Sequence, residues 1–394
     1  MKRIALIDAL RGFALFLILI FHAYGNFGVF YESENNFPGI DMLDNLVIRF
    51  MYLFVVDKAF AIFSIMFGFS FFIQMDRSAL KNEQFSMLFA RRLLILLVIG
   101  YLNALIYRGD ILTKYAVIGF ILLGLSRFNS KVLIGLATLL LLNIPGIVSV
   151  FQNLNPASVQ TVMENGESAW GEVSRVYTEG SLFDVIAINL WVVFSEIWLH
   201  NLKSGRIMFI IGYFIIGLLI GRSRLFEKVN EKTPQLRAVL FVSAGAYILI
   251  RLIRFSLEKS LDYPDQAMVM ISDLLNGYMS IFTAFFMFAG FILLYQHTGL
   301  RNLFSYLAPY GRMGLTTYVM QGIIGVVLFY GFGFGLFRWG TPFFSVLVGI
   351  AIFFLQLVFS HFWFKKYAYG PLEWVWRSLT FPGKKIPLKK TIEK

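Results

Sequence analysis

The 394-residue sequence contains no cysteine, and only 15% of its residues are charged. The absence of cysteine excludes disulfide bonds, zinc sites that use cysteine ligands and any acyl thioester carried by the protein itself. The four histidines are too widely scattered in the sequence to form a recognisable metal motif: His22, His200, His297 and His361. We therefore expect no metal site and no permanently bound cofactor.

Apolar residues are abundant. Hydrophobic residues make up 58% of the chain, whereas soluble domains carry about 45–50% apolar and about 25% charged residues. This composition is typical of a membrane protein with many apolar helices. The net charge of +12 would suggest nucleic acid in a soluble protein. Here the basic residues flank apolar segments, which favours a lipid bilayer with anionic lipids as the partner and no nucleic acid.

Ten apolar segments are long enough, together with their flanking residues, to cross a bilayer as helices. They lie at about 12–30, 58–75, 92–107, 112–126, 131–152, 207–222, 237–256, 278–296, 314–335 and 343–364. The sequence therefore predicts an all-α polytopic membrane helical bundle of about ten transmembrane helices.

The orientation of the bundle follows from its basic residues. Lys2 and Arg3 place the N-terminus in the cytoplasm, because cytoplasmic flanks are enriched in Lys and Arg. The apolar stretch 183–200 is interrupted by Asp184, Asn189 and Glu196. If it crossed the membrane, the basic loop 222–237 would lie outside. We favour a stretch that lies in the interface or re-enters the membrane, because that loop and both termini are then cytoplasmic.

No repeat or linker divides the chain, so we predict one transmembrane domain at 1–381 and a basic cytoplasmic tail at 382–394. The tail is expected to be disordered against anionic lipid, since it carries five lysines: Lys384, Lys385, Lys389, Lys390 and Lys394. Residues 41–57 are predicted to form an amphipathic helix on the outer surface. The polar, acidic residues 153–181 are predicted to form an external loop that caps a cavity.

The first apolar segment carries three ionisable residues on one stripe: Asp8, Arg11 and His22. On an α-helix, Arg11 and His22 lie about 20° apart in azimuth and roughly 16 Å apart along the axis. Asp8 precedes Arg11 by three residues and can pair with it. Each ionisable group costs roughly 2.5–3.5 kcal/mol at the centre of a membrane helix, which favours a functional reason for keeping them.

Each member of the stripe has two interpretations. His22 is a candidate general acid–base for an acceptor hydroxyl, or a core histidine bonded to a carbonyl. Arg11 is a candidate site for phosphate or carboxylate, or a side chain that reaches the lipid headgroups or pairs with Asp8 only for structure.

Further along the chain, Arg91 and Arg92 are candidates to join Arg11 in binding an anionic donor, or they simply flank a span on its cytoplasmic side. Asp110 caps the next helix or orients His22. Gly68 is expected at a close helix approach. Six polar side chains are candidates to line a cavity or to bond between helices: Asn26, Asn103, Tyr115, Thr317, Gln321 and His361.

Three sets of residues resemble signatures of the YeiB-type family of bacterial membrane proteins, a family of unknown function. The first is Asp8-Ala9-Leu10-Arg11-Gly12-Phe13-Ala14, and the second is Arg91-Arg92-Leu93-Leu94 followed by Gly109-Asp110-Ile111-Leu112. The third is Gly311-Arg312-Met313-Gly314-Leu315-Thr316-Thr317-Tyr318 followed by Gly370-Pro371-Leu372-Glu373-Trp374. Together these motifs span nearly the whole chain.

The fold of this family resembles the transmembrane acyltransferase superfamily, whose sugar-modifying branch has an arginine and a histidine separated by ten residues in its first span. Arg11 and His22 match that spacing, whereas the adjacent Arg91 and Arg92 do not reproduce the spacing of that branch's second arginine pair. The resemblance implies a multi-pass enzyme of the bacterial cytoplasmic membrane.

Such an enzyme would move an acetyl or similar group from the co-substrate acyl-CoA in the cytoplasm to an envelope saccharide or secreted metabolite at the outer face. Asp8, Arg11, Arg91 and Arg92 would then bind the donor, and His22 and Asp110 would be catalytic. The alternative is a transporter of a small anionic or sugar-like substrate without covalent chemistry, with these groups in a substrate or proton path.

Overall fold

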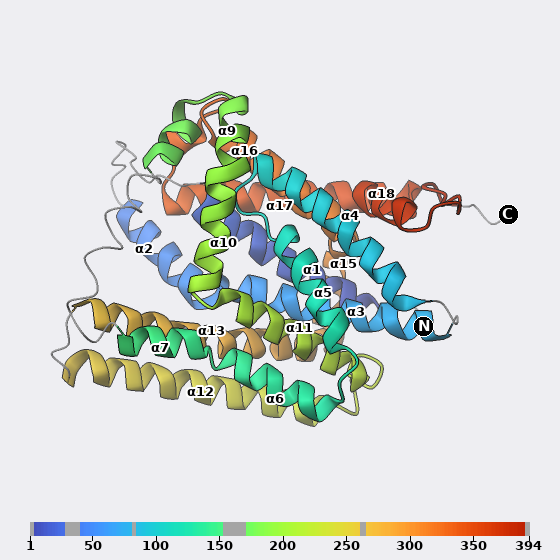
Figure 1. The fold of residues 1–394 in the computed structure, drawn as a ribbon, viewed down its shortest axis with the longest axis horizontal. Coiled ribbons are helices and arrows are strands. Elements are labelled where there is room, and N and C mark those ends of the chain that lie inside the picture. Colours follow the sequence, from blue (N-terminus) through green and yellow to red (C-terminus); the bar gives the residue numbers. More distant parts are fainter. Residues whose placement is uncertain (1–3, 28–39, 81–83, 153–170, 261–264, 391–394) are drawn as a thin grey trace.

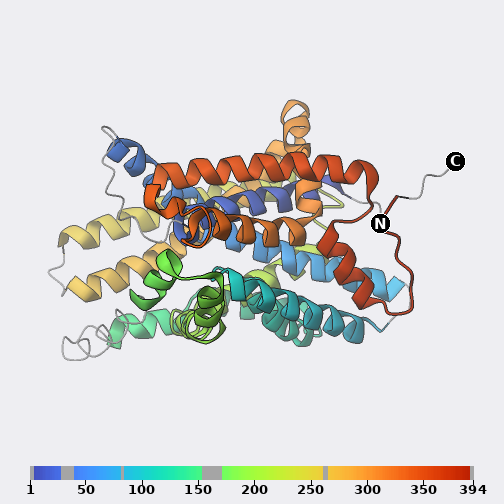
Figure 2. The same cartoon turned by 90° about the horizontal axis from the view of Figure 1, so that it is seen from above.

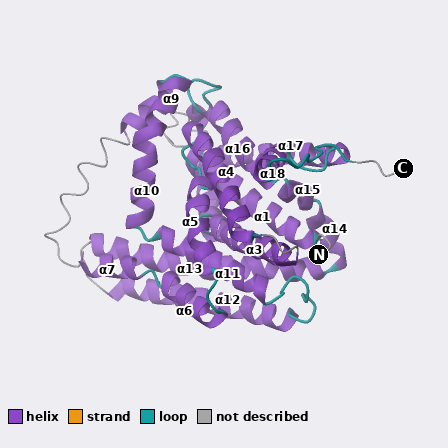
Figure 3. Cartoon of the chain, turned by 45° about the vertical axis from the view of Figure 1, so that its right-hand side comes forward, coloured by secondary structure: helices purple, strands orange, loops and turns teal. Residues whose placement is uncertain are grey.

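The computed structural model describes residues 4–27, 40–80, 84–152, 171–260 and 265–390. Within these ranges the chain is helical and forms no strand (Figure 3). The helices of the first half are α1 (Ala5–Phe21), α2 (Ile40–Phe50), α3 (Lys58–Leu80), α4 (Phe85–Ile106), α5 (Leu112–Leu125), α6 (Ser130–Leu141) and α7 (Ile144–Gln152). Residues 171–179 are also helical.

The second half contains α9 (Leu182–Ile188), α10 (Phe194–Lys203), α11 (Arg206–Arg222), α12 (Thr233–Ser260), α13 (Asp265–Gln296), α14 (Thr298–Ser305), α15 (Leu307–Arg312), α16 (Gly314–Phe329), α17 (Pro342–Lys366) and α18 (Pro371–Thr380). Each of the ten predicted apolar segments contains a helix, but α16 ends at Phe329, before the predicted 335. The largest differences are at α13, which begins 13 residues before the predicted 278, and at 131–152, where Asn143 breaks the helix at a positive φ of 50°.

Among the described residues, eight helical stretches are long and apolar enough to cross a membrane, and α5 and α16 are shorter apolar helices. The chain is therefore an all-α polytopic bundle, as predicted. Helix α1 lies inside the bundle, where 72% of the residues in its most apolar stretch are buried. In α12, on the outside, only 11% of the residues in the corresponding stretch are buried (Figures 1 and 2). The beginning of α1 and helix α18 lie at the same end of the molecule (Figure 1).

The stretch 182–202 is one of the eight by length and composition. It runs from α9 through a short π-helical segment into α10 without a break, so it does not have the turn that a re-entrant hairpin requires. Figures 1 and 3 show α10 lying across the direction of α12 and α13 rather than parallel to them.

Three peripheral segments were predicted from the sequence: a surface helix, a capping loop and a basic tail. Helix α2 is mostly exposed, as an amphipathic surface helix would be. Of the predicted capping loop, residues 153–170 lie outside the described residues. The tail is held against the body rather than disordered up to Lys390: the Ala368 N–H donates to Leu388 O at 2.8 Å, and the Trp374 indole N–H donates to Ile386 O at 2.9 Å.

Two glycine contacts bring helices together around the first span. A Cβ at Gly311 of α15 would collide with the Asp8 carbonyl oxygen, and one at Gly12 with the Leu307 carbonyl. A Cβ at Gly68 of α3 would likewise collide with the Phe214 carbonyl of α11, which confirms the close approach predicted there. Small residues let membrane helices pack at backbone contact distance, and here this fixes what faces α1.

Candidate functional site: two cavities along the first helix

Two cavities lie along α1. The first, called here the Arg11 cavity, has a volume of about 220 Å³ and is lined by residues of α1, α3, α4, α5, α15, α16 and α18. Its charged lining residues are Arg11, Arg92, Arg312 and Glu373. A smaller pocket of about 140 Å³ shares Arg92 with it and adds two more arginines, Arg77 and Arg377. This end of the molecule therefore presents an arginine-rich hollow suited to anions.

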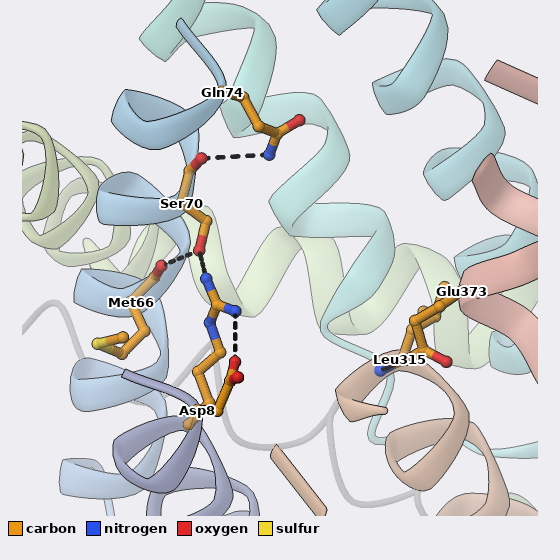
Figure 4. A network of polar contacts seen from close by, with 7 residues as sticks. Asp8, Met66, Ser70, Gln74, Leu315 and Glu373 are labelled. Carbon is orange, nitrogen blue, oxygen red and sulfur yellow. Dashed lines mark hydrogen bonds and ion pairs between the residues drawn. The ribbon is translucent and has the colours of Figure 1, made fainter. Parts of the chain in front are cut away.

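Arg11 is fixed from two sides (Figure 4). Its guanidinium pairs with Asp8 at 3.4 Å, which confirms the predicted pair, and donates to Ser70 Oγ of α3 at 2.5 Å. Ser70 in turn donates to the Met66 carbonyl at 2.5 Å. The Arg11 side chain keeps 27% of its surface exposed within the cavity-lining set. Arg11 thus lines a cavity and is held by contacts to α1 and α3.

The two neighbouring arginines of α4 separate in space. Arg92 lines the Arg11 cavity, and its guanidinium carbon lies 4.4 Å from the centroid of the Trp376 ring. Arg91 instead donates to the Thr380 carbonyl at the end of α18, at 3.4 Å, and lines neither cavity. Of the two arginines predicted to bind a donor, only Arg92 lines the Arg11 cavity.

Glu373 of α18 also lines the Arg11 cavity. Its carboxylate accepts from the Leu315 N–H at 2.7 Å and from the Thr316 hydroxyl at 2.6 Å. It thereby satisfies N–H groups in the first turn of α16, which have no partner within the helix. Figure 4 shows Glu373 beside Leu315. Burial raises the pKa of the Glu373 carboxyl, and the hydrogen bonds from Thr316 and Leu315 oppose that rise.

The second cavity, called here the His22 cavity, has a volume of about 420 Å³. It is lined by residues of α1, α3, α5, α10, α11 and the turn between α4 and α5, and its charged and imidazole side chains are His22, Asp57, Arg108, Lys114, His200 and Arg206. His22 begins a π-helical segment, His22–Phe27, that continues α1. Such segments occur often at functional sites because they redirect side chains.

The His22 imidazole is enclosed but not hydrogen-bonded at one nitrogen. Its exposed fraction is 4%, and Nδ1 has no hydrogen-bond partner in the described part of the chain. The rings of Tyr107 and Tyr318 pack edge-on against it, with centroids at 4.9 Å and 5.7 Å. A core histidine bonded to a carbonyl through Nδ1 is thus not what the structure contains.

Asp110 caps α5. One carboxylate oxygen accepts from the N–H and the hydroxyl of Thr113, both at 2.9 Å, and the other accepts from Asn103 at 3.0 Å. Burial raises the pKa of the Asp110 carboxyl, against the effect of these hydrogen bonds. Among the described contacts none joins Asp110 to His22, so capping is the role that the geometry supports. Tyr318 fixes the same turn by accepting from the Ile111 N–H at 2.9 Å.

A short barrier separates the two cavities. Phe63 of α3 lines the Arg11 cavity, and Phe60, one helical turn earlier, lines the His22 cavity. In α5, Tyr115 lines the Arg11 cavity and its neighbour Lys114 lines the His22 cavity. The Tyr115 hydroxyl is 2.5 Å from Ser64 Oγ, and the Phe63 and Tyr115 rings stack at 5.7 Å. The stripe on α1 therefore serves two sites, one at each of its ends.

The remaining predicted cavity residues divide clearly. Tyr115 lines the Arg11 cavity, and the Asn26 side chain lies outside the described residues. The other four line neither cavity: Asn103, Thr317, Gln321 and His361. Asn103 bonds to Asp110 in the adjoining turn, Thr317 to the Met313 carbonyl at 3.1 Å and His361 to the Leu357 carbonyl at 2.9 Å. Neither amide atom of the buried Gln321 has a hydrogen-bond partner in the described residues.

Four lining residues of the His22 cavity were not singled out from the sequence: Asp57, Arg108, Lys114 and Arg206. Lys114 carried a usable signal, since a lysine inside an apolar helix is costly and therefore informative. Arg108 adjoins the Gly109-Asp110 turn. Asp57 and Arg206 form an ion pair between the start of α3 and the start of α11, which sequence spacing does not reveal.

Fold and site together define a polytopic helical membrane protein with two separate cationic cavities along a buried first helix. The chain belongs to the YeiB-type family. It is 30% identical to the uncharacterized protein YxaH of Bacillus subtilis over 99% of this chain and 97% of the relative. It is 24% identical to the uncharacterized protein YeiB of Escherichia coli over 99% of this chain and 100% of the relative.

A third relative, an uncharacterized 39.9 kDa protein encoded in the amylase 3′ region of Bacillus acidopullulyticus, is 28% identical over 98% of this chain and 96% of its own. Residues 220–383 match the family described as a protein of unknown function, DUF418. No solved structure matches the chain. These matches confirm the membership in the YeiB-type family that the sequence motifs predicted.

Proposed function

We propose that this chain is an acyltransferase of the bacterial cytoplasmic membrane that moves an acetyl or similar group from cytoplasmic acyl-CoA to an acceptor at the outer face. The observation that carries the proposal is the placement of His22. It is a buried imidazole with an unbonded Nδ1 in one cavity, and Arg11 lies in a second cavity toward the other end of the same helix. A transfer across a membrane requires a donor site and an acceptor site arranged in this order.

The donor side of the proposal rests on charge. Arg11, Arg92 and Arg312 face one hollow, and guanidinium groups bind phosphate oxygens in a planar, bidentate manner. The Asp8 and Ser70 contacts hold Arg11 in one orientation, so less side-chain freedom is lost when a phosphate binds. The diphosphate of CoA has the matching charge.

The acceptor side rests on the imidazole. A neutral His22 would take the proton of an acceptor hydroxyl while the hydroxyl oxygen attacks the thioester carbonyl carbon. A C–O bond forms, the C–S bond breaks, and the proton passes to the leaving sulfur to give free CoA. The donor arm must reach past Phe63 and Tyr115 to bring its thioester to His22, since the two cavities are separate.

The orientation and partners belong to the same proposal. The end of the molecule that carries α18 and the beginning of α1 would face the cytoplasm and anionic lipid, in keeping with the basic residues there (Figure 1). The His22 cavity would open toward the outer face, where an envelope saccharide or a secreted metabolite is available.

One observation favours the alternative, a transporter without covalent chemistry. The barrier of Phe63, Ser64 and Tyr115 between two polar cavities is the arrangement that a substrate path closed at its centre would have. In that case Arg11 would bind an anionic substrate and His22 would carry a proton.

Release of CoA thiol by the purified chain tests the proposal. Because the chain has no cysteine, a thiol-reactive dye reports only the released CoA. The chain in lipid nanodiscs, given acetyl-CoA and a panel of envelope saccharides, should release CoA only with an acceptor present. His22→Gln should lower this rate by about 10²–10⁴-fold.

The exposed His297 provides a matched control, since His297→Gln changes the same residue type away from both cavities. Acetyl-CoA that neither binds nor is cleaved under any acceptor would rule out the enzyme. Counterflow of a labelled anion in liposomes that survives His22→Gln but fails with Arg11→Gln would establish the transporter instead.

A further inference from the structure

The His22 cavity contains more positive than negative charge. Arg108, Lys114 and Arg206 line it, and Asp57 is its one lining carboxylate in the described part of the chain. Asp57 is already paired with Arg206, so that pair contributes little net charge. Arg108 and Lys114 contribute two further cationic side chains to the cavity, beside the imidazoles of His22 and His200.

Lys114 is the least satisfied of these groups. No hydrogen bond or ion pair joins its ammonium to another described residue, although it lies in helix α5 and lines the His22 cavity. Asp110 attracts it electrostatically, but the Asp110 oxygens are occupied by Thr113 and Asn103. A lysine retained in such a place without a partner is costly unless a ligand supplies the negative charge.

Arg108 is held in place by the first helix. Its guanidinium donates to the Gly25 carbonyl at 3.1 Å, inside the π-helical segment that His22 begins. The Arg108 guanidinium and the His22 imidazole are thus both positioned by the segment His22–Phe27. The cavity volume of about 420 Å³ lies within the range of small-molecule sites, roughly 300–1,000 Å³.

From this arrangement we infer that the His22 cavity is a binding site for an oxyanion, a carboxylate or phosphate group on the acceptor molecule, with Lys114 and Arg108 as its charged ligands. The inference rests on the proposed function for the role of His22 and narrows the acceptor class: an acidic or phosphorylated acceptor rather than a neutral sugar. The oxyanion anchors the acceptor, and its hydroxyl then lies beside the imidazole.

Direct binding measurements test this site without any catalytic readout. The purified full chain in nanodiscs is titrated at low salt with radiolabelled inorganic phosphate, succinate and glycerol. We expect at least one anion to bind while glycerol does not, and the preferred anion identifies the phosphate or carboxylate class. Lys114→Gln should weaken that binding by about 10–100-fold, as expected for a lost charge-assisted hydrogen bond, and Lys114→Arg should retain most of it.

Two control variants locate the effect. Lys131→Gln removes an exposed lysine away from both cavities and should change nothing. Because the Arg11 cavity is itself suited to phosphate, the titration is repeated in the Arg11→Gln variant, in which the binding that depends on Lys114 should persist. Anion binding that is lost in Arg11→Gln but kept in Lys114→Gln would place the anion in the other cavity and overturn the inference, as would equal binding of glycerol or no anion binding at all.

The outcome is separable from that of the proposed function. Anion binding that depends on Lys114, in a protein that never releases CoA, would refute the acyltransferase and leave the anion site in place. CoA release that depends on His22, with binding indifferent to Lys114, would support the enzyme and refute the anionic acceptor.

Discussion

Leu15 lines the Arg11 cavity, and Ile18, one helical turn later on α1, lines the His22 cavity. Three residues of helix correspond to a rise of about 4.5 Å, so the barrier between the two cavities is only about one turn thick along α1. On its other side the barrier is made by Phe63, Ser64 and Tyr115. Whether a donor arm or a whole substrate passes it, the passage requires movement of these few side chains.

Single cysteines placed on either side of this barrier should react from opposite faces of the membrane. The chain has no cysteine of its own, so Leu15→Cys and Ile18→Cys each create one reactive site. With an anionic, membrane-impermeant thiosulfonate, Ile18→Cys should react in intact cells and Leu15→Cys in inside-out vesicles. Adding Tyr115→Ala should make each cysteine reactive from both faces, because it removes the largest side chain of the barrier.

A cysteine at the exposed, apolar Leu139 of α6 serves as the control for this experiment and should resist the reagent from both faces. Reaction of Leu15→Cys and Ile18→Cys from the same face would contradict the separation of the cavities.

Substitution of the adjacent arginines of α4 should have unequal effects on donor affinity. Arg92→Gln should weaken acetyl-CoA binding by about tenfold or more, since a charged phosphate contact contributes roughly 1.5–3 kcal/mol. Arg91→Gln should leave the affinity nearly unchanged, because Arg91 bonds to the Thr380 carbonyl outside the cavity. Equilibrium binding of labelled acetyl-CoA measures both, and equal losses in the two variants would count against the assigned donor site.

Much of the site was predictable where the relevant contacts are local in sequence. The Asp8–Arg11 pair lies three residues apart on one helix, and the capping of α5 by Asp110 involves residues within one turn. The small residue at Gly68 predicted a close approach without saying which helix would make it. In each case the short-range geometry of a helix was sufficient.

The rest depends on packing between distant segments. Arg91 and Arg92 differ in role because neighbours on a helix point about 100° apart, and only the position of α18 decides which one faces the cavity. Lys114 and Arg206 come together because α5 and α11 converge on the cavity, which no sequence spacing encodes. The tail to Lys390 is ordered by backbone bonds to 366–368, contacts that a run of lysines does not suggest.

Gly311→Ala should destabilise the protein, because the added Cβ would collide with the Asp8 carbonyl of α1. The expected loss is on the order of 1–3 kcal/mol, as for other overpacked positions, and the shift of α1 should also weaken acetyl-CoA binding at Arg11. Thermal unfolding followed by helical circular dichroism measures the first effect. Gly135→Ala is the matched control: a Cβ there meets nothing within 4 Å, so this change should be neutral or slightly stabilising.

Glu373 should make stability depend on pH. Its pKa is raised above the ordinary value of 4.5 by burial, so the folded protein binds this proton more tightly than the unfolded chain does. The stabilising contribution of the protonated form is therefore complete below pH 4.5 and is lost as the pH rises through the folded-state pKa. We therefore compare the thermal unfolding midpoints of wild type and Glu373→Gln. The wild-type midpoint minus the Glu373→Gln midpoint should decrease as the pH rises above about 4.5.

The exposed Glu231 provides the control for this pH series. Glu231→Gln should follow wild type in parallel, because its carboxylate lies in solvent and its contact with Lys228 contributes little. A difference between wild type and Glu373→Gln that grows with pH would mean that the hydrogen bonds from Leu315 and Thr316 outweigh burial. Glu373 would then be ionised in the folded protein, and its negative charge would offset part of the positive charge of the arginines in the Arg11 cavity.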